Sequence, residues 1–191
     1  MTLRKLFRLD RGGALSDERG SAAVEFAIIA PILGLMLAGV ADFGGVVFVK
    51  FRMESAVSAG ANYAIVNASK VTATNASDLA SKISAVVANS GSSSTGTNTV
   101  VVNNGPSATT DAGAVTTSGT ASNADSCFCP TVVSSTLTWG SAAACGSACG
   151  SGGTAGKFIT ITANRNYSPL FSSYGIVKSG SVSVKVTVQV Q

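Results

Sequence analysis

The hydropathy pattern of the chain is dominated by one long apolar run near the N-terminus. From Val24 to Val49 only Glu25 and Asp42 carry an ionisable side chain. As a helix this run would extend about 39 Å, which exceeds the ~30 Å hydrocarbon core of a bilayer. The pattern therefore predicts a transmembrane helix, which we assign to residues 21–50.

The apolar positions become sparser beyond the run, and their helical period is weak. We expect residues 51–89 to continue as helix, ending in a short amphipathic helix over 78–89. Asp78 or Ser77 would cap its N-terminus. Its apolar side is formed by four residues: Leu79, Ile83, Val86 and Val87.

The C-terminal half changes to the period of a β-strand. Residues 181–191 alternate strictly, with valine at every even position from 182 to 190, and residues 157–167 also alternate. Two strands make a poor sheet, so a third strand or the N-terminal helix has to cover the valines. Val100–Asn103 is a short candidate strand.

The intervening segments are rich in Ser, Thr, Ala and Gly. Residues 90–99 and 104–126 have this composition, which is typical of surface loops. The prediction for the whole chain is an α+β protein, with a long N-terminal transmembrane helix followed by a small extracytoplasmic domain that ends in an antiparallel β-sheet. We assign residues 90–191 to a β region within that domain.

Charge sets the expected orientation. Charged residues make up 12% of the chain, and the net charge is +4. We assign residues 1–20 to a basic cytoplasmic leader, which holds five basic residues: Arg4, Lys5, Arg8, Arg11 and Arg19. Lys50 and Arg52 are the two that closely follow the apolar run, so the bias favours the N-terminus inside and the C-terminal domain outside the cytoplasmic membrane. No later segment combines clustered Lys and Arg with aromatic residues, so we expect no nucleic-acid partner.

Candidate catalytic chemistry is scarce. The chain has no histidine, which removes Ser-His-Asp and Cys-His catalysis and the commonest zinc ligand. It has neither a GxGxxG fingerprint nor a P-loop. We therefore expect no enzymatic activity, no cofactor and no small-molecule substrate.

Four cysteines lie in two clusters in the C-terminal half: Cys127, Cys129, Cys145 and Cys149. A Cys₄ zinc site is one interpretation, but CxC is an irregular zinc spacing. An oxidising location favours two disulfides that join the clusters. The spacing leaves both cross-cluster pairings open, and either would close a loop around Trp139.

Glu25 is unexpected inside a membrane helix and needs an explanation. A peptidase cut after Gly20 would make Ser21 the first residue and Glu25 the fifth. The new α-ammonium could then pair with the Glu25 carboxylate of a neighbouring parallel helix, which offsets the cost of either buried charge and fixes the axial register. The alternative is an ordinary signal peptide cut after Gly39-Val40-Ala41, leaving Asp42 as the new N-terminus.

Small residues recur along the apolar run at intervals of four. Ala30, Gly34 and Ala38 form this series, and Asp42 comes next, approximately on the same face. Such a stripe lets a second helix approach closely. We interpret these residues as a helix-packing surface.

The segment RGSAAVEFAIIAPILGLMLAGVADFGGVVFVKFRMESAVSAGANYA resembles the TadE-like family of tight-adherence (Tad/Flp) pilus assembly proteins. The resemblance rests on Arg19-Gly20, the small residues 21–23, Val24-Glu25-Phe26, Pro31, Asp42-Phe43-Gly44 and the alanine-rich end. Glu25-Phe26, where the major pilin usually has Glu-Tyr, fits a minor component better than the fibre subunit. Gly45 departs from the many members that have a basic residue there.

The resemblance implies a pseudopilin-like membrane protein that is cut between Gly20 and Ser21 by a prepilin peptidase. It also implies a single-pass protein of a bacterial inner membrane, with the N-terminus in the cytoplasm and the C-terminal domain in the periplasm or outside the cell with the pilus. The implied partners are other Tad pseudopilins and the inner-membrane secretion platform. The expected function is structural, in pilus assembly through helix packing and export of the small domain. The alternative is a membrane-anchored or secreted adhesin-like binding module, which would tolerate loss of Glu25.

Overall fold

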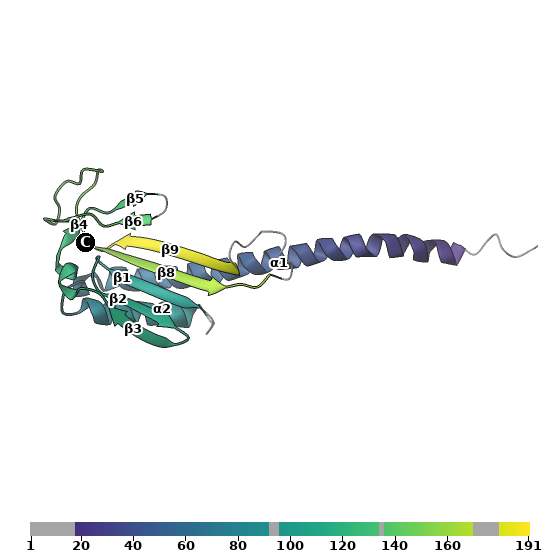
Figure 1. Ribbon diagram of the computed structural model, residues 1–191, viewed down its shortest axis with the longest axis horizontal. Coiled ribbons are helices and arrows are strands. Elements are labelled where there is room, and N and C mark those ends of the chain that lie inside the picture. Colours follow the sequence, from purple (N-terminus) through teal and green to yellow (C-terminus); the bar gives the residue numbers. More distant parts are fainter. Residues whose placement is uncertain (1–17, 92–95, 134–135, 170–179) are drawn as a thin grey trace, which may run out of the picture. The chain divides into compact units, whose positions relative to one another are not determined.

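The computed structural model describes residues 18–91, 96–133, 136–169 and 180–191 (Figure 1). The chain divides into two compact units, Met1–Asp42 and Phe43–Gln191. Most of the basic leader assigned to residues 1–20 lies outside the described residues, as does the central part of the link before the last strand.

Helix α1, Glu18–Val66, is continuous over 49 residues. In the first unit its large apolar side chains are exposed; Phe26 is 72% exposed and Val40 is 70% exposed. In the second unit it contributes buried residues, among them Met53, Val57 and Ala64. The predicted long apolar helix is therefore confirmed, and α1 continues beyond residue 50 as far as Val66.

A short 3₁₀ turn, η1 (Ala68–Lys70), leads to α2, Ala76–Ser90. Asn75 occupies the N-cap position, so the prediction of Asp78 or Ser77 is wrong. The helix begins earlier because Ala76 is already fully buried in the core. Asp78 lies in the first turn instead and pairs with Lys82 at 2.8 Å, which raises the pKa of that lysine through the hydrogen bond and the opposite charge.

Five strands form one antiparallel sheet in the second unit (Figure 1). Its order is β3-β2-β1-β8-β9. The strands are β1 (Thr97–Val102), β2 (Ser107–Asp111), β3 (Ala114–Ser118), β8 (Phe158–Asn166) and β9 (Ser181–Gln189). The two predicted C-terminal strands pair with each other, and β1 supplies the third strand that they needed.

Two of these strands correct the prediction that residues 104–126 are loops. Besides β2 and β3 this segment contains a second 3₁₀ turn, η2 (Ala121–Asp125). Hydropathy missed the strands because β3 is exposed along its whole length and β2 buries only Ala108 and Thr110. Residues 90–99 are also not all loop, because β1 begins at Thr97.

The turns hold the signal that hydropathy lacked. Ala112 and Gly113 both have positive φ, as the two central residues of a type I′ hairpin turn require, and they join β2 to β3. Asn103 and Asn104 also have positive φ, which asparagine tolerates, at the turn from β1 to β2. The sequences NNG and DAG were therefore hairpin signals.

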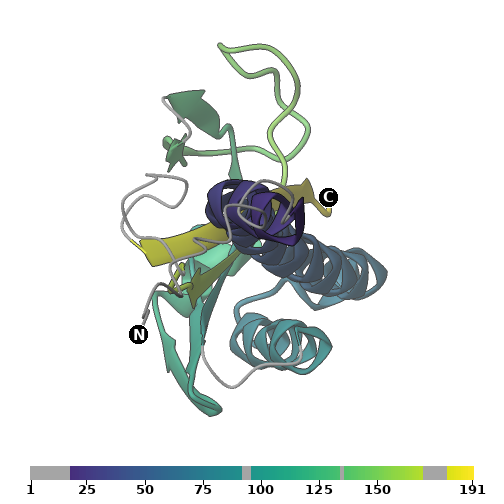
Figure 2. The same cartoon turned by 90° about the vertical axis from the view of Figure 1, so that its right-hand side faces the viewer.

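One face of the sheet carries the core. Figure 2 shows α2 and the later part of α1 together on this face. Leu79 and Ile83 of α2 are fully buried, as are Ile159 and Ile161 of β8. On β9 the even-numbered valines point to the core and the odd-numbered residues are exposed, as the alternation predicted.

Between β3 and β8 the chain forms a disulfide-bonded segment, residues 127–149, whose strands are not part of the five-stranded sheet. It contains two small antiparallel pairs, β4 (Cys127–Phe128) with β7 (Ala142–Ala143) and β5 (Thr131–Val133) with β6 (Thr136–Thr138). The ring of Phe128 contacts the Trp139 ring edge-on, with 5.9 Å between their centroids.

Candidate functional site

The predicted cleavage and assembly residues lie at the start of α1. Gly20, Ser21 and Glu25 are all exposed in the first turns of the helix. The Ser21 hydroxyl donates to the Glu25 carboxylate over 3.5 Å, which places positions 21 and 25 on one face. A cut before Ser21 would therefore put an α-ammonium one helical turn from the carboxylate.

Phe26 and the small-residue stripe follow on the same helix. Phe26 is exposed. Ala30 and Ala38 are half-buried, whereas Gly34 is exposed and a Cβ built on it meets nothing within 4 Å. Asp42, the last member of the stripe, is 3% exposed. Gly34 thus has space beside it for the backbone of another helix.

All four cysteines form disulfides that join the two clusters. Cys127 bonds to Cys145, and Cys129 bonds to Cys149. This is one of the two pairings that the spacing left open. It leaves no thiolate for the Cys₄ zinc site that the same cysteines suggested. Among the described residues no other group of three or more His, Cys, Asp or Glu is placed to hold a metal ion.

Asn103 is a structural centre that the sequence did not reveal. It is fully buried, and its side-chain NH₂ faces three carbonyl oxygens, those of Asn123, Ala124 and Ser126. Its side-chain oxygen accepts the backbone N–H of Phe158 over 3.3 Å. One side chain therefore joins the β1–β2 turn to η2 and to the start of β8.

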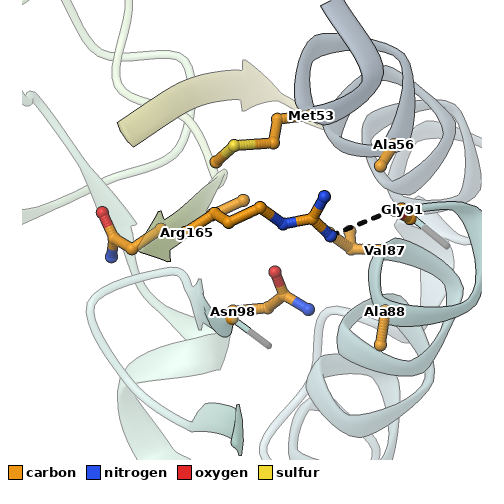
Figure 3. A pocket seen from close by; sticks show the side chains of 10 residues that line it. Met53, Ala56, Val87, Ala88, Gly91, Asn98 and Arg165 are labelled. Carbon is orange, nitrogen blue, oxygen red and sulfur yellow. Dashed lines mark hydrogen bonds between the residues drawn. The ribbon is translucent and has the colours of Figure 1, made fainter. Parts of the chain in front are cut away.

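Figure 3 shows a small cavity between α1, α2 and the sheet. The Arg165 guanidinium reaches from β8 and donates to the carbonyl oxygen of Gly91 over 3.1 Å. Gly91 is the C-cap of α2, where a cation also complements the helix dipole. The cavity volume is about 20 Å³, enough for about one water molecule, so it is not a ligand site.

The geometry therefore singles out the exposed part of α1. Within the described residues one helix is long and apolar enough to cross a membrane, Gly20–Val66, and its most apolar stretch is not buried at all. A core helix would be buried, so this exposure favours a membrane anchor.

Residues 20–62 match the family model of the TadE-like protein. This segment is TadE-like. The match begins at Gly20, next to the predicted cleavage position, and it covers the exposed apolar part of α1 together with the first buried turns of the second unit. No curated protein and no solved structure matches the chain. The TadE-like segment thus supports a protein of the Tad pilus system that is anchored in a membrane.

Proposed function

We propose that the chain is a pseudopilin-like structural component of Tad pilus assembly. The observation that carries the proposal is that the family match contains the exposed apolar part of α1. The TadE-like segment, residues 20–62, includes every large apolar side chain that α1 exposes from Val24 to Phe51. A surface of this kind is stable in lipid or against other apolar helices, but not in water.

The anchor would be single-pass, with the basic leader in the cytoplasm and the second unit in the periplasm. Five basic residues before the apolar run Val24–Val49 and two closely after it favour this orientation. Two disulfides in the second unit fit an oxidising compartment. The proposed partners are a prepilin peptidase, other Tad pseudopilins and the inner-membrane secretion platform.

Glu25 would act in assembly rather than in catalysis. After a cut at Gly20–Ser21, the Ser21 α-ammonium and the Glu25 carboxylate lie on one helix face, as the Ser21–Glu25 contact indicates. In a bundle of parallel helices each group can meet its counterpart on the neighbouring chain. A pair is far less costly in a low-dielectric bundle than either charge alone, and it also fixes the axial register. The protein would do its work through this pairing and through helix packing, without catalysing a reaction.

The first test is the mature N-terminus of the protein from its native host, read by intact mass. Prepilin-type processing gives Ser21 as the first residue. A chain that begins at Asp42 would identify an ordinary signal peptide and favour the adhesin-like alternative. An uncut chain would contradict the role proposed for the α-ammonium.

The second test is Glu25→Ala, with Glu54→Ala as the matched control. Both residues are glutamates of α1, and Glu54 forms an exposed pair with Lys50 at 3.8 Å. We expect Glu25→Ala to insert in the membrane and to lose piliation, whereas Glu54→Ala keeps it, because an exposed ion pair contributes little. Normal piliation of Glu25→Ala would refute the register role.

A further inference from the structure

The free edge of β9 is the basis of a further inference, which does not depend on the pilus role. Among the strands that the structure describes, β9 is the last of the sheet and pairs with β8 alone. At nine residues it is longer than the usual strand of about five to six. A long edge strand presents a row of backbone groups to which another extended chain can bind.

The hydrogen-bond pattern shows which groups face outward. The carbonyl of Gly180 accepts from the N–H of Tyr167, and the N–H of Val190 donates to the carbonyl of Lys157, so even-numbered residues of this strand bond toward β8. Beyond the end of β9 the carbonyl of Gln191 also accepts from the N–H of Lys157. Antiparallel pairing alternates. Ser183, Lys185 and Thr187 therefore direct their N–H and C=O groups to the free edge, and all three residues are exposed. Within the described part of the chain no group bonds to these backbone atoms.

A hollow of about 250 Å³ lies beside this edge. Its lining combines Lys185 and Thr187 of β9 with Val132 and Leu137, which face each other across the β5–β6 hairpin. Val132 is 69% exposed, so the aliphatic side of the hollow is open to an incoming side chain. Strand addition takes its affinity from main-chain hydrogen bonds and its specificity from such side-chain pockets.

The positive charge of Lys185 determines which kind of strand can pair with the free edge of β9. Lys185 is the only charged residue of β9 and lies at its centre. Antiparallel pairing of two β9 strands in the centred register would place Lys185 opposite the same lysine of the second copy, and like charges directly opposite destabilise a pair. A strand with a carboxylate at that position would instead gain a favourable cross-strand pair.

We propose that the β9 edge binds an extended, β-branched segment of another protein that places an Asp or Glu opposite Lys185, and that it discriminates against a second β9. The hollow beside Lys185 receives the acidic side chain and its aliphatic neighbours. The other edge strand, β3, has five residues and no charge, and therefore lacks this selectivity.

The test uses the full chain in detergent and two peptides, Ac-Thr-Val-Thr-Glu-Thr-Val-Thr-NH₂ and its twin with Lys in place of Glu. Affinities are measured for the native chain and for Lys185→Glu. We expect the native chain to prefer the Glu peptide by about tenfold and Lys185→Glu to prefer the Lys peptide. Lys185 is exposed on the outer face, so the variant is expected to fold.

Hydrogen exchange of the bound chain locates the peptide. The amides of Ser183, Lys185 and Thr187 are expected to become protected, while those of Val184 and Val186 are already protected by β8 and serve as the internal control. A charge preference without protection at the odd-numbered amides would reduce the interaction to surface electrostatics and overturn strand addition. Binding of neither peptide, or equal binding of both, would also overturn the proposal.

Discussion

Single polar side chains connect segments of the second unit that are far apart in the sequence. Lys157 is buried, and its ammonium donates to the carbonyl oxygen of Val71 over 2.8 Å. The hydroxyls of Ser84 and Thr110 form a buried pair at 2.5 Å between α2 and β2. Each such bond contributes about 1 kcal/mol to stability, and losing one partner costs more because the other group stays buried and unsatisfied. The Ser84–Thr110 contact fixes the position of β2, a polar strand that has few apolar residues to bury.

Gly45 has a packing reason for its departure from the family pattern. A Cβ built on Gly45 would lie 2.6 Å from the hydroxyl oxygen of Tyr167 and 3.5 Å from the ring carbon that carries it. Gly45→Ala gains up to ~1 kcal/mol of helix propensity but costs about 1–3 kcal/mol because the hydroxyl has to move, so we predict a net loss of about 1–2 kcal/mol in the free energy of unfolding. The same substitution in a Tyr167→Phe background is expected to be neutral or stabilising, because the remaining contact is an ordinary one.

The measurement is a double-mutant cycle on thermal unfolding of the detergent-solubilised chain. The cycle cancels whatever Tyr167→Phe costs by itself. We expect a coupling free energy of about 1–2 kcal/mol between the two sites. Additive effects would show that the tyrosine hydroxyl is not what excludes a side chain at position 45.

The packing of α1 on α2 and the sheet depends on Gly60. A Cβ at this position would lie 2.5 Å from a methyl group of Val87 and 3.3 Å from one of Ile161. Gly60→Ala gains up to ~1 kcal/mol of helix propensity but overpacks the core by about 1–3 kcal/mol. We predict a net loss of about 1–2 kcal/mol in the free energy of unfolding.

Gly44→Ala is the matched control for Gly60→Ala. Both glycines lie inside α1, but a Cβ at Gly44 meets nothing within 4 Å. Thermal unfolding should therefore show Gly44→Ala as neutral or stabilising. Equal effects of the two substitutions would mean that helix propensity, and not the contact with Val87, decides the outcome.

The elements that the sequence predicted are those with a strong hydropathy period. The apolar half of α1 and the alternating valines of β9 are visible because their apolar residues recur at the helical and strand periods. β2 and β3 were missed because their pairing, and not an apolar face, defines them. Only their turns, with Asn103 and Gly113 at positive φ, carried a local signal.

The candidate site was predicted from chemistry rather than from periodicity. Glu25 was predicted to be an assembly residue because a carboxylate is costly in an apolar helix. The structural role of Asn103 could not be predicted in this way, because an asparagine in a polar stretch is typical of a loop. Only the folded chain brings the carbonyl oxygens of Asn123 and Ser126 to its side chain. The spacing of the cysteines left two cross-cluster pairings open, and the fold of the disulfide-bonded segment selects between them.

The whole chain combines a folded α+β unit with a helix segment whose apolar side chains have no cover among the described residues. From Val24 to Phe43 the large apolar side chains are 52–72% exposed. Lipid covers such a surface without discriminating between faces of the helix. Association with other helices does discriminate, because only a face of small residues permits close approach.

This difference makes the stripe testable with two glycines of the apolar run that lie on different faces of α1. Gly34 lies on the stripe, whereas Gly39 lies about 140° around the helix from it, and both have open space at the Cβ position. We predict that Gly34→Leu inserts and folds normally but lowers pilus yield several-fold, because leucine holds the neighbouring helix away. Gly39→Leu is expected to leave the yield unchanged. Yield is compared with the amount of membrane-inserted protein in the native host, and similar yields for the two variants would show that the stripe is not the packing face.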